Sequence, residues 1–457
     1  MDYSALPVFD TAEVVVCGGG TAGAFAAYAA ADEGADVLVI EQLSSLGGSA
    51  TNGLVTPVMS THIKGEKQCS YISRILAERL IAENGAEGNG SYFDPMMLRL
   101  TLETMCAEKG VRTLFYTTIA DVIREDGKIT ALVVCNKRGL GLIKARVFID
   151  STGDGDVCVR AGAEYTKGNP ENGKNQPVSL RYIAGNIDYD AFGQFLREQV
   201  AETGKNFAAE YWQDHLYAAC CNGEQWTLGA VFDKAIAAGD LLPEDRAYWQ
   251  IFTVPGRPGC LAFNTPEFFE HTDGTDPADL SFIQADGKKR IIRQMKFYKK
   301  YFRGFENAYI CEIASQVGVR ESRNITTEYV LTASDLLSRA KFADMFCQSN
   351  YPVDIHGKSL NFGKIKVTPN EDGKNWYEIP YRSLVVKGID NLFVAGRCLG
   401  AEFLAQSSLR VQHSVRSSGE AAGIAAVMCV RGNVLPRLLD GASVREVMIS
   451  KGAEYTE

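Results

Sequence analysis

The chain has 457 residues, of which 46% are hydrophobic and 23% charged, and its formal net charge at pH 7 is −9. This length exceeds one ordinary domain of ~100–200 residues, so two or three lobes are expected. The acidic balance argues against a nucleic-acid partner, because proteins that bind nucleic acid usually carry a basic footprint. No stretch approaches the ~18 uncharged apolar residues of a membrane helix, and the acidic N-terminal residues are unlike a signal peptide. The composition therefore predicts a cytoplasmic protein that acts on small molecules and has no membrane partner.

The first recognisable unit lies at the N-terminus. A short β-branched run at 14–17 is followed by three glycines, an alanine-rich stretch at 22–31 and the apolar segment "ADVLVIE" at 35–41. This order predicts a strand, a glycine-rich turn, a helix and a second strand, which together form a βαβ unit. The small side chains of the helix let it lie close to the sheet and to a ligand.

The glycines satisfy the pattern G-x-G-x-x-G as Gly18, Gly20 and Gly23. In a dinucleotide site the first makes the tight turn, the second lets backbone amides approach a pyrophosphate, and the third allows close packing of helix and strand. The helix N-terminus supplies N–H groups and a positive dipole end to the phosphates. Glu41, at the end of the next strand, is placed to accept hydrogen bonds from a ribose diol. The motif predicts a dinucleotide site but does not separate FAD from NAD.

Residues 93–111 carry the signals of a helix, with Asp94 as N-cap, Pro95 at the first position and Gly110 as the stop. Two strands follow, joined by a turn at 125–127. A further buried strand from 145 runs into the polar loop "DSTGDGD". From about Lys167 the amino-acid composition changes to that of a loop rich in Gly, Asn and Pro, which favours a domain boundary there.

The second lobe contains an aromatic-rich region at 206–269 and a basic amphipathic helix at 286–303. Near 376 the chain returns to short strands, and a second small-residue helix is expected at 413–430, closed by Gly432. The predicted fold is α/β: a Rossmann-like dinucleotide-binding domain, a parallel sheet with helices, into which an α+β substrate domain is inserted. The predicted bounds are 1–165 with 376–431 for the dinucleotide domain, 166–375 for the substrate or cap domain and 432–457 for a C-terminal tail.

Several stretches together resemble a known family. They are "LSSLGGSATNG" at 43–53, "DSTGDGD" at 150–156 and "NLFVAGR" at 391–397, and further "GVRESRNITTEYVLT", "DIHG", "IPYRSL" and "AGRCLGAEFLAQSSLRV". The chain resembles the bacterial FAD-dependent oxidoreductases of the glutathione-reductase-like (GR2-type) flavoprotein superfamily. The resemblance covers nearly the whole chain but is thin between about 190 and 310, where substrate contacts are expected. It implies FAD as the cofactor and says little about the substrate.

The glycine motif and the resemblance together define the expected cofactor site. The glycine turn would hold the pyrophosphate and Glu41 the adenosine ribose, while the later loops would approach the flavin and its ribityl chain. The N-terminus of the last helix, after Arg410 and Val411, would direct its positive end at the flavin. The expected cofactor-binding residues are Gly18, Gly20, Thr21, Ala22, Gly23, Glu41, Gln42, Gly47, Gly48, Thr51, Asn52, Gly153, Asp154, Gly396, Arg397, Arg410 and Val411.

Hydride transfer also requires a group that manages a proton. His356, in a family-like motif next to Asp354, is the first candidate, and Arg320 and Arg382 are candidates for contact with the substrate. An arginine near the flavin could anchor a carboxylate, whereas its structural alternative is a salt bridge at the domain interface. Glu321, Arg323, Tyr381, Gln176, Ser179 and Arg181 are weaker candidates of the same kind.

The twelve cysteines show no C-x-x-C pair, and the five histidines show no H-x-x-x-H spacing. Neither a disulfide framework nor a metal site is expected from this pattern. A second G-x-G-x-x-G is missing, so reducing equivalents would come from the substrate, from visiting NAD(P)H or from an electron-transfer protein. The expected function is hydride transfer between flavin N5 and a small organic substrate, in a protein that can form a homo-oligomer. The alternatives are an oxidase or monooxygenase that uses O₂, a tRNA-modifying flavoprotein and an electron-carrier subunit.

Overall fold

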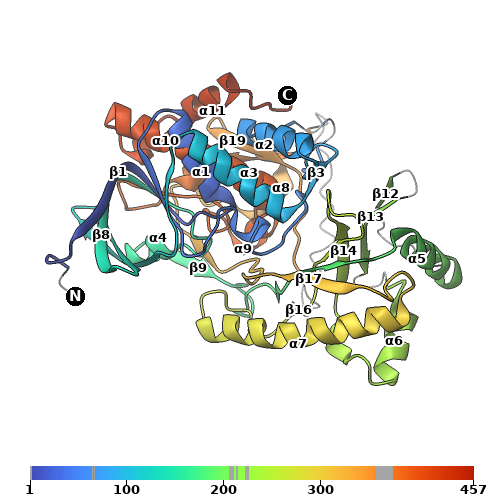
Figure 1. The fold of residues 1–457 in the computed structure, drawn as a ribbon. Coiled ribbons are helices and arrows are strands. Elements are labelled where there is room, and N and C mark those ends of the chain that lie inside the picture. The colour runs from blue at the N-terminus through green and yellow to red at the C-terminus, as the bar shows by residue number, and fades with distance from the viewer. Residues whose placement is uncertain are drawn as a thin grey trace.

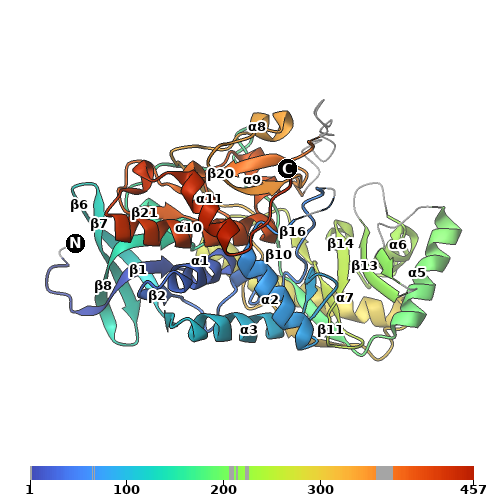
Figure 2. The ribbon, with the colours of Figure 1, turned by 90° about the horizontal axis from the view of Figure 1, so that it is seen from above.

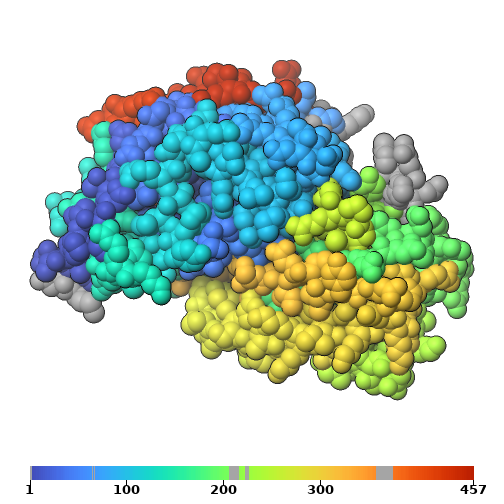
Figure 3. Space-filling view, in the orientation of Figure 1, coloured from blue at the N-terminus to red at the C-terminus, as the bar shows by residue number. Residues whose placement is uncertain are grey.

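The computed structural model describes residues 3–63, 65, 67–204, 210–212, 215–221, 226–356 and 374–457. In these residues a sheet made from both ends of the chain lies beside a second sheet made from its middle (Figure 1). The space-filling view shows the two lobes in contact, with the N- and C-terminal segments in one lobe and the middle segments in the other (Figure 3). The predicted α/β architecture with an inserted α+β lobe is confirmed.

The first sheet has seven strands, five of them parallel in the order β5-β2-β1-β8-β21. On the far edge of β8, β7 and β6 add an antiparallel meander, joined by the turn at Asp126 and Gly127, both with positive φ. The bounds are β1 Val8–Cys17, β2 Val37–Ile40, β5 Arg112–Leu114, β6 Thr118–Glu125, β7 Lys128–Asn136, β8 Gly139–Asp150 and β21 Leu392–Val394.

Both faces of this sheet are buried, which explains why its strands read as continuous apolar runs. Along β1, Val14 and Val16 join the core under the helices, whereas Val15 and Cys17 join the core on the opposite face, with the meander. The helical layer consists of α1, α2, α3, α10 and α11, and the short α4 lies on the other face. The helix bounds are α1 Thr21–Asp32, α2 Tyr71–Ala82, α3 Pro95–Glu108, α4 Asp156–Arg160, α9 Phe403–Leu409, α10 Gln412–Gly432 and α11 Gly441–Ser450.

Helices α1 and α10 come from opposite ends of the chain and lie side by side (Figure 2). A Cβ at Gly419 would overlap the carbonyl oxygen of Ala22, and one at Gly423 would overlap that of Ala26. The two helices therefore touch backbone to backbone, which only glycine permits. This contact joins segments from both ends of the chain in one helical layer.

Buried polar groups fix the ends of two helices. Asp94 caps α3 by accepting from the Met96 N–H at 2.8 Å, as its sequence position predicts. Glu420 of α10 accepts from Ser70 Oγ at 2.6 Å and from the Ile72 N–H at 3.1 Å, at the start of α2. Burial raises the pKa of Glu420 to about 8, although these donors act against the shift.

The inserted lobe is built on an antiparallel sheet in the order β12-β13-β14-β15-β11-β17, and the long helix α7 runs along the lower edge of Figure 1. Its core is rich in aromatic side chains around Phe192, Trp249 and Phe302. The predicted helix at 286–303 is longer at its start, since Asp276 caps it at Pro277. The bounds are β11 Tyr182–Gly185, α5 Tyr189–Thr203, β12 Glu210–Trp212, β13 His215–Cys221, α6 Gly229–Ala237, β14 Trp249–Thr253, β15 Leu261–Phe263, α7 Pro277–Tyr301 and β17 Tyr309–Ile313.

The predicted domain ends differ from the packing that the structure shows. Leu331, Leu336 and Phe346, inside the predicted cap, belong to the core of the FAD domain. The predicted tail contains α11, whose Val444 and Met448 enter the same core, so it is an integral part of that domain. Helix α10 includes Gly432 and ends at Asn433, which has a positive φ. The remaining elements are α8 Ala333–Ser338, β3 Ala86–Glu87, β4 Tyr92–Phe93, β9 Tyr165–Lys167, β10 Val178–Ser179, β16 Glu267–Phe268, β18 Arg323–Ile325, β19 Met345–Ser349 and β20 Tyr377–Pro380.

Across the described residues, we find no helix with the length and apolar character needed to cross a membrane.

Candidate functional site

Four loops meet at the carboxyl edge of the parallel sheet, where ligands bind in open α/β folds. They follow β1, β2, β8 and β21 and contain, in that order, the glycine turn 18–23, Glu41 with the loop 43–53, the segment 151–156 and the segment 395–397. These four loops, all of them predicted to approach the cofactor, therefore lie at one end of one sheet.

The glycine turn has the geometry that a pyrophosphate site requires. Gly18 has φ +90°, and a Cβ there would lie 2.7 Å from the Ser151 carbonyl oxygen. A Cβ at Gly23 would overlap the Gly18 carbonyl oxygen, so helix and turn can be this close only with glycine. At Gly20, by contrast, a Cβ would meet no protein atom nearer than 3.8 Å. The N-terminus of α1 is therefore open at Gly20, which is where a pyrophosphate fits.

Glu41 is buried and is held by the glycine turn itself. Its carboxylate accepts from the Gly19 N–H at 2.7 Å and from the Leu43 N–H at 2.7 Å. Burial raises its pKa, while the two N–H donors act in the opposite direction. Two fixed donors orient the carboxylate and leave lone pairs for ribose hydroxyls, so the residue fits its predicted role. Gln42, next to it, is exposed.

The second glycine-rich loop packs on the first. The Gly47 N–H donates to the Gly19 carbonyl at 2.8 Å, and Thr21 Oγ1 donates to the Gly47 carbonyl at 2.9 Å. A Cβ at Gly48 would lie 2.7 Å from Gly20 Cα, so these backbones are in contact. This arrangement brings the two glycine-rich loops together.

Two further residues of this loop are buried. Thr51 Oγ1 donates to the Leu46 carbonyl at 2.7 Å. The Asn52 side-chain oxygen accepts from Ser45 at 2.9 Å, while its amide nitrogen Nδ2 has no hydrogen-bond partner among the described residues. A buried amide donor of this kind is available to an acceptor on a ligand.

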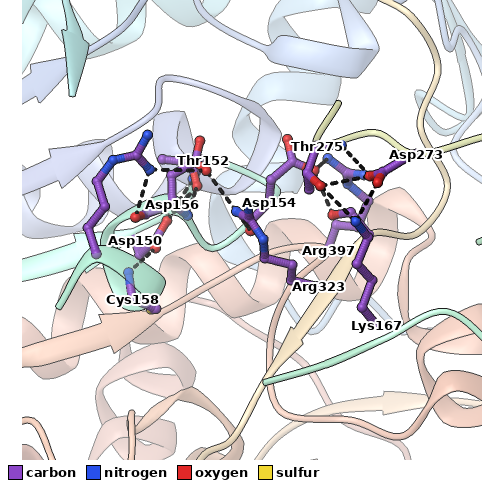
Figure 4. A network of polar contacts seen from close by, with 12 residues as sticks. Asp150, Thr152, Asp154, Asp156, Cys158, Lys167, Asp273, Thr275, Arg323 and Arg397 are labelled. Atoms are coloured by element: carbon purple, nitrogen blue, oxygen red, sulfur yellow. Dashed lines mark hydrogen bonds and ion pairs between the residues drawn. The ribbon is translucent and has the colours of Figure 1, made fainter. Parts of the chain in front are cut away.

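An ion pair between side chains links the third loop to the fourth (Figure 4). Arg397 Nη2 lies 2.8 Å from Asp154 Oδ1, and a Cβ at Gly153 would lie 2.9 Å from the same guanidinium nitrogen. Gly396 has φ +90° and donates its N–H to Ser418 Oγ of α10 at 2.9 Å. A Cβ there would lie 3.1 Å from the Cβ of Ala22, so this loop packs on the start of α1.

A group of charged side chains lies where the inserted lobe meets the FAD domain. Glu267 Oε1 is 2.8 Å from Arg320 Nη2 and 2.8 Å from His356 Nδ1. On the other side of the imidazole, Nε2 is 3.6 Å from Asp354 Oδ1, and Asp354 accepts from Arg410 Nη2 at 2.9 Å. The side chain of Glu267 is only 2% exposed. We call the following residues the charged cluster: Arg181, Glu267, Arg320, Asp354, His356 and Arg410.

The charged cluster keeps its carboxylates ionised. Burial by itself would raise the pKa of Glu267, but the charges of His356 and Arg320 outweigh it and the pKa is lowered. For Asp354, burial is likewise outweighed by His356, Arg410 and Arg320, and its pKa is also lowered. The cluster is therefore a set of anions and cations that depend on one another out of water.

Gln406 of α9 links the charged cluster to the cofactor loops. Its Nε2 donates to the Arg320 carbonyl at 3.0 Å and to the Arg397 carbonyl at 3.3 Å. Arg410 ends α9, and Val411 is the N-cap of α10. Arg410, which pairs with Asp354, thus links the charged cluster to the start of α10.

The predicted catalytic residues do not all lie together. His356 and Arg320 are both in the charged cluster, but Arg382 lies elsewhere, bonded to Asp344 at 2.9 Å and half-exposed. It belongs to a 3-10 turn at 381–384 and not to a strand, so it does not face the cluster. Glu321 accepts from the Gly168 N–H, and Arg323 pairs with Asp156 at 2.9 Å, so both hold loops in place.

Sequence reasoning missed Glu267, the centre of the charged cluster. The available signal is an acidic residue in the apolar, aromatic stretch "LAFNTPEFF", where a charge is costly without partners. The prediction that the chain has no metal site also depended only on the spacing of cysteines and histidines along the sequence. In the described part of the chain, Cys69, Cys347 and His413 are buried with their ligand atoms within 4.8 Å of one another, a grouping that could hold a metal ion and that spacing along the chain does not reveal. A hydrogen bond with Cys347 and burial raise the pKa of the Cys69 thiol well above its usual range.

The curated relatives that the chain matches are named for different reactions. A thiamine thiazole synthase of Methanococcus aeolicus is 30% identical over 155 residues, 31% of this chain and 54% of the relative. The digeranylgeranylglycerophospholipid reductase 2 of Methanopyrus kandleri is 28% identical over 153 residues, 31% of this chain and 37% of the relative. The chain thus spans about half the length of these relatives or less.

A solved structure of a geranylgeranyl bacteriochlorophyll reductase-like protein from Thermoplasma acidophilum aligns with a TM-score of 0.48 at 13% identity, covering 97% of this chain and 84% of that one. The family of FAD dependent oxidoreductases matches residues 13–448. The prediction of FAD as the cofactor is thereby confirmed. With nearly its whole length matched and its four loops arranged for a dinucleotide, the chain belongs to the FAD dependent oxidoreductase family.

Proposed function

We propose that this protein transfers a hydride between FAD and a small organic substrate held at the charged cluster. The observation that carries the proposal is the buried pair of Glu267 and His356, 2.8 Å apart, at the junction of the inserted lobe and the FAD domain. The four cofactor loops would hold FAD through the residues predicted for them, with its pyrophosphate at the open N-terminus of α1. When bound, FAD supplies the hydride acceptor or donor at N5.

The side chains of the cluster would manage the proton that accompanies a hydride. His356 has one ring nitrogen beside Glu267 and the other toward Asp354, so both nitrogens are placed to hold or pass on a proton. Glu267 would orient the imidazole, and Arg320 would keep Glu267 ionised. The ring centre of Tyr248 is 5.0 Å from that of His356, whose side chain is only 12% exposed to solvent. Glu267 and Arg320 are positioning residues in this scheme.

The proposal extends to the compartment, the superfamily, the redox partner and the assembly. All twelve cysteines are unpaired, which supports a reducing compartment, and we propose the cytoplasm. We also propose that the family relationship extends to the bacterial glutathione-reductase-like (GR2-type) flavoproteins. NAD(P)H or an electron-transfer protein is the proposed redox partner, and a homo-oligomer is the proposed assembly.

An anaerobic titration of the FAD-loaded protein with a panel of metabolites tests the proposal. We expect one class of compound to bleach the flavin absorbance in the wild type. The variant His356→Gln should retain FAD but lose about 10²–10⁴-fold in reduction rate, which is the usual contribution of a general acid or base. His271→Gln is the matched control, because His271 is exposed and bonded to Asp279. A rate equal in His356→Gln and wild type would refute the assigned role, and a protein that takes up no FAD would refute the proposed function.

A further inference from the structure

Arg181 is a buried cation with an unused hydrogen-bond donor. It directly precedes β11, and its backbone carbonyl accepts from the Ala314 N–H at 2.9 Å, which fixes its place at the sheet. Its side chain lies within the fold, since the residue is only 9% exposed. Its Nη1 has no hydrogen-bond partner among the described residues. A buried guanidinium in this state is costly, and such a cost is usually met by an anion.

The other cations of the charged cluster already have anions. Arg320 pairs with Glu267 at 2.8 Å, and Arg410 pairs with Asp354 at 2.9 Å. Of the three arginines in the charged cluster, Arg181 alone has no carboxylate partner among the described residues. Burial and then the nearby charge of Arg320 lower the pKa of Arg181 to about 9, so the surroundings of this guanidinium are unfavourable for a positive charge.

We propose that Arg181 binds the carboxylate group of the substrate, so that the substrate is a small carboxylic acid. This inference rests on the proposed function, whose substrate class it names. A carboxylate is a planar anion, whereas inorganic phosphate is tetrahedral. The planar guanidinium also matches a carboxylate in shape. The bound acid would lie beside His356, since Glu267 is a neighbour of both residues.

The electrostatic role of Arg181 predicts opposite effects on binding and on stability. A substitution such as Arg181→Met removes an unpaired buried cation, so the ligand-free protein should not lose thermal stability and should gain it if the fold is otherwise unchanged. The same substitution removes the anion site. A purely structural arginine would behave differently, because its loss would lower the stability without changing the affinity for anions.

The test uses the FAD-loaded protein, with propionate as the probe, propionamide as its neutral counterpart and inorganic phosphate as the alternative anion. Binding is followed by the change in the flavin absorbance spectrum, and stability by thermal unfolding. We expect saturable binding of propionate, weaker binding of phosphate and none of propionamide. Arg181→Met and Arg181→Gln should weaken propionate binding by roughly 10- to 150-fold, the loss of one charge-assisted hydrogen bond.

Arg303→Gln is the matched control, because Arg303 lies on the surface of the same lobe and pairs with Glu198 at 2.8 Å. It should leave propionate binding unchanged. Equal propionate affinity in wild type and Arg181→Met would overturn the inference, as would tighter binding of phosphate than of propionate. If either result is found in a protein that binds FAD and is reduced by a metabolite, the carboxylate assignment alone fails and the proposed function stands.

Discussion

Two neighbouring glycines of the turn after β1 should respond in opposite ways to the same substitution. At Gly20 the backbone has φ −65° and ψ −168°, which alanine adopts without strain, and the new Cβ would be no nearer than 3.8 Å to any protein atom. At Gly23 the new Cβ would overlap the Gly18 carbonyl oxygen and lie 2.7 Å from Ser151 Oγ. Gly20→Ala should therefore fold, whereas Gly23→Ala should force helix α1 away from its strand.

The expected magnitudes follow from these contacts. Alanine at the N-cap position of α1 should lower the free energy of unfolding of Gly20→Ala by only about 0.5–1 kcal/mol. The same methyl group fills the opening at the helix N-terminus, and overpacking of this kind costs ~1–3 kcal/mol, or roughly a 5- to 150-fold weaker Kd for FAD. Gly23→Ala should lose ~3 kcal/mol or more of folding stability, since its overlap is with backbone.

Both variants can be measured on the apoprotein. FAD binding is followed by the change in flavin fluorescence during titration, and stability by the denaturant midpoint without FAD. Wild-type FAD affinity in a folded Gly20→Ala variant would show that the pyrophosphate is bound elsewhere. A Gly23→Ala variant as stable as Gly20→Ala would show that the close approach of helix and turn has no role in the fold.

Three other substitutions test the cofactor domain. Glu41→Gln places an amide where two backbone N–H groups now donate to a carboxylate; one unsatisfied donor costs ~1–3 kcal/mol, so FAD binding should weaken about tenfold or more, measured by the same titration. Unchanged affinity would exclude Glu41 from the ribose site. Glu420→Gln tests a carboxyl group whose pKa in the folded protein is raised to about 8. The stabilisation from this group is fully present below the pKa of the unfolded chain, near 4.5, so the wild type should lose up to ~5 kcal/mol of folding stability as the pH rises through 8. The variant should lose less. Parallel stability–pH curves for the two proteins would contradict this assignment. Gly419→Ala should destabilise the protein by ~3 kcal/mol or more in denaturant unfolding, because its methyl group would overlap the Ala22 carbonyl oxygen. Gly193→Ala in α5 is its control, since that Cβ meets only Arg197 Nη2, at 3.9 Å, and should change the stability by less than ~1 kcal/mol; equal effects of the two would refute the helix contact.

The parts of the site that the sequence predicts are those that local chain geometry determines. The turn from Gly18 to Gly23 and the acid at Glu41 belong to one βαβ unit, in which spacing along the chain sets spacing in the structure. The charged cluster could not be predicted in this way. Glu267, Arg320 and His356 come from different segments, and only the packing of the chain brings Arg320 and His356 each to 2.8 Å from Glu267.

The same reason explains the domain bounds. Composition changes near residue 167 and again near 376, but Leu336 and Phe346 lie between these points and still pack in the FAD domain. The identity and sequence position of an apolar residue do not determine in which of two cores it packs. Pairing and packing across the chain decide this, and Arg382 illustrates the converse, since a family-like motif places it in a turn away from the cluster.

The contact between α1 and α10 has a consequence for the order in which this protein is made. Residues 21–32 leave the ribosome early, yet the glycines that receive their backbone lie at 419 and 423. The helical layer over the glycine turn therefore stays incomplete during most of translation, while the inserted lobe already has all of its strands. A nascent chain that ends before α10 should not retain FAD, so cofactor capture becomes one of the last events of biosynthesis.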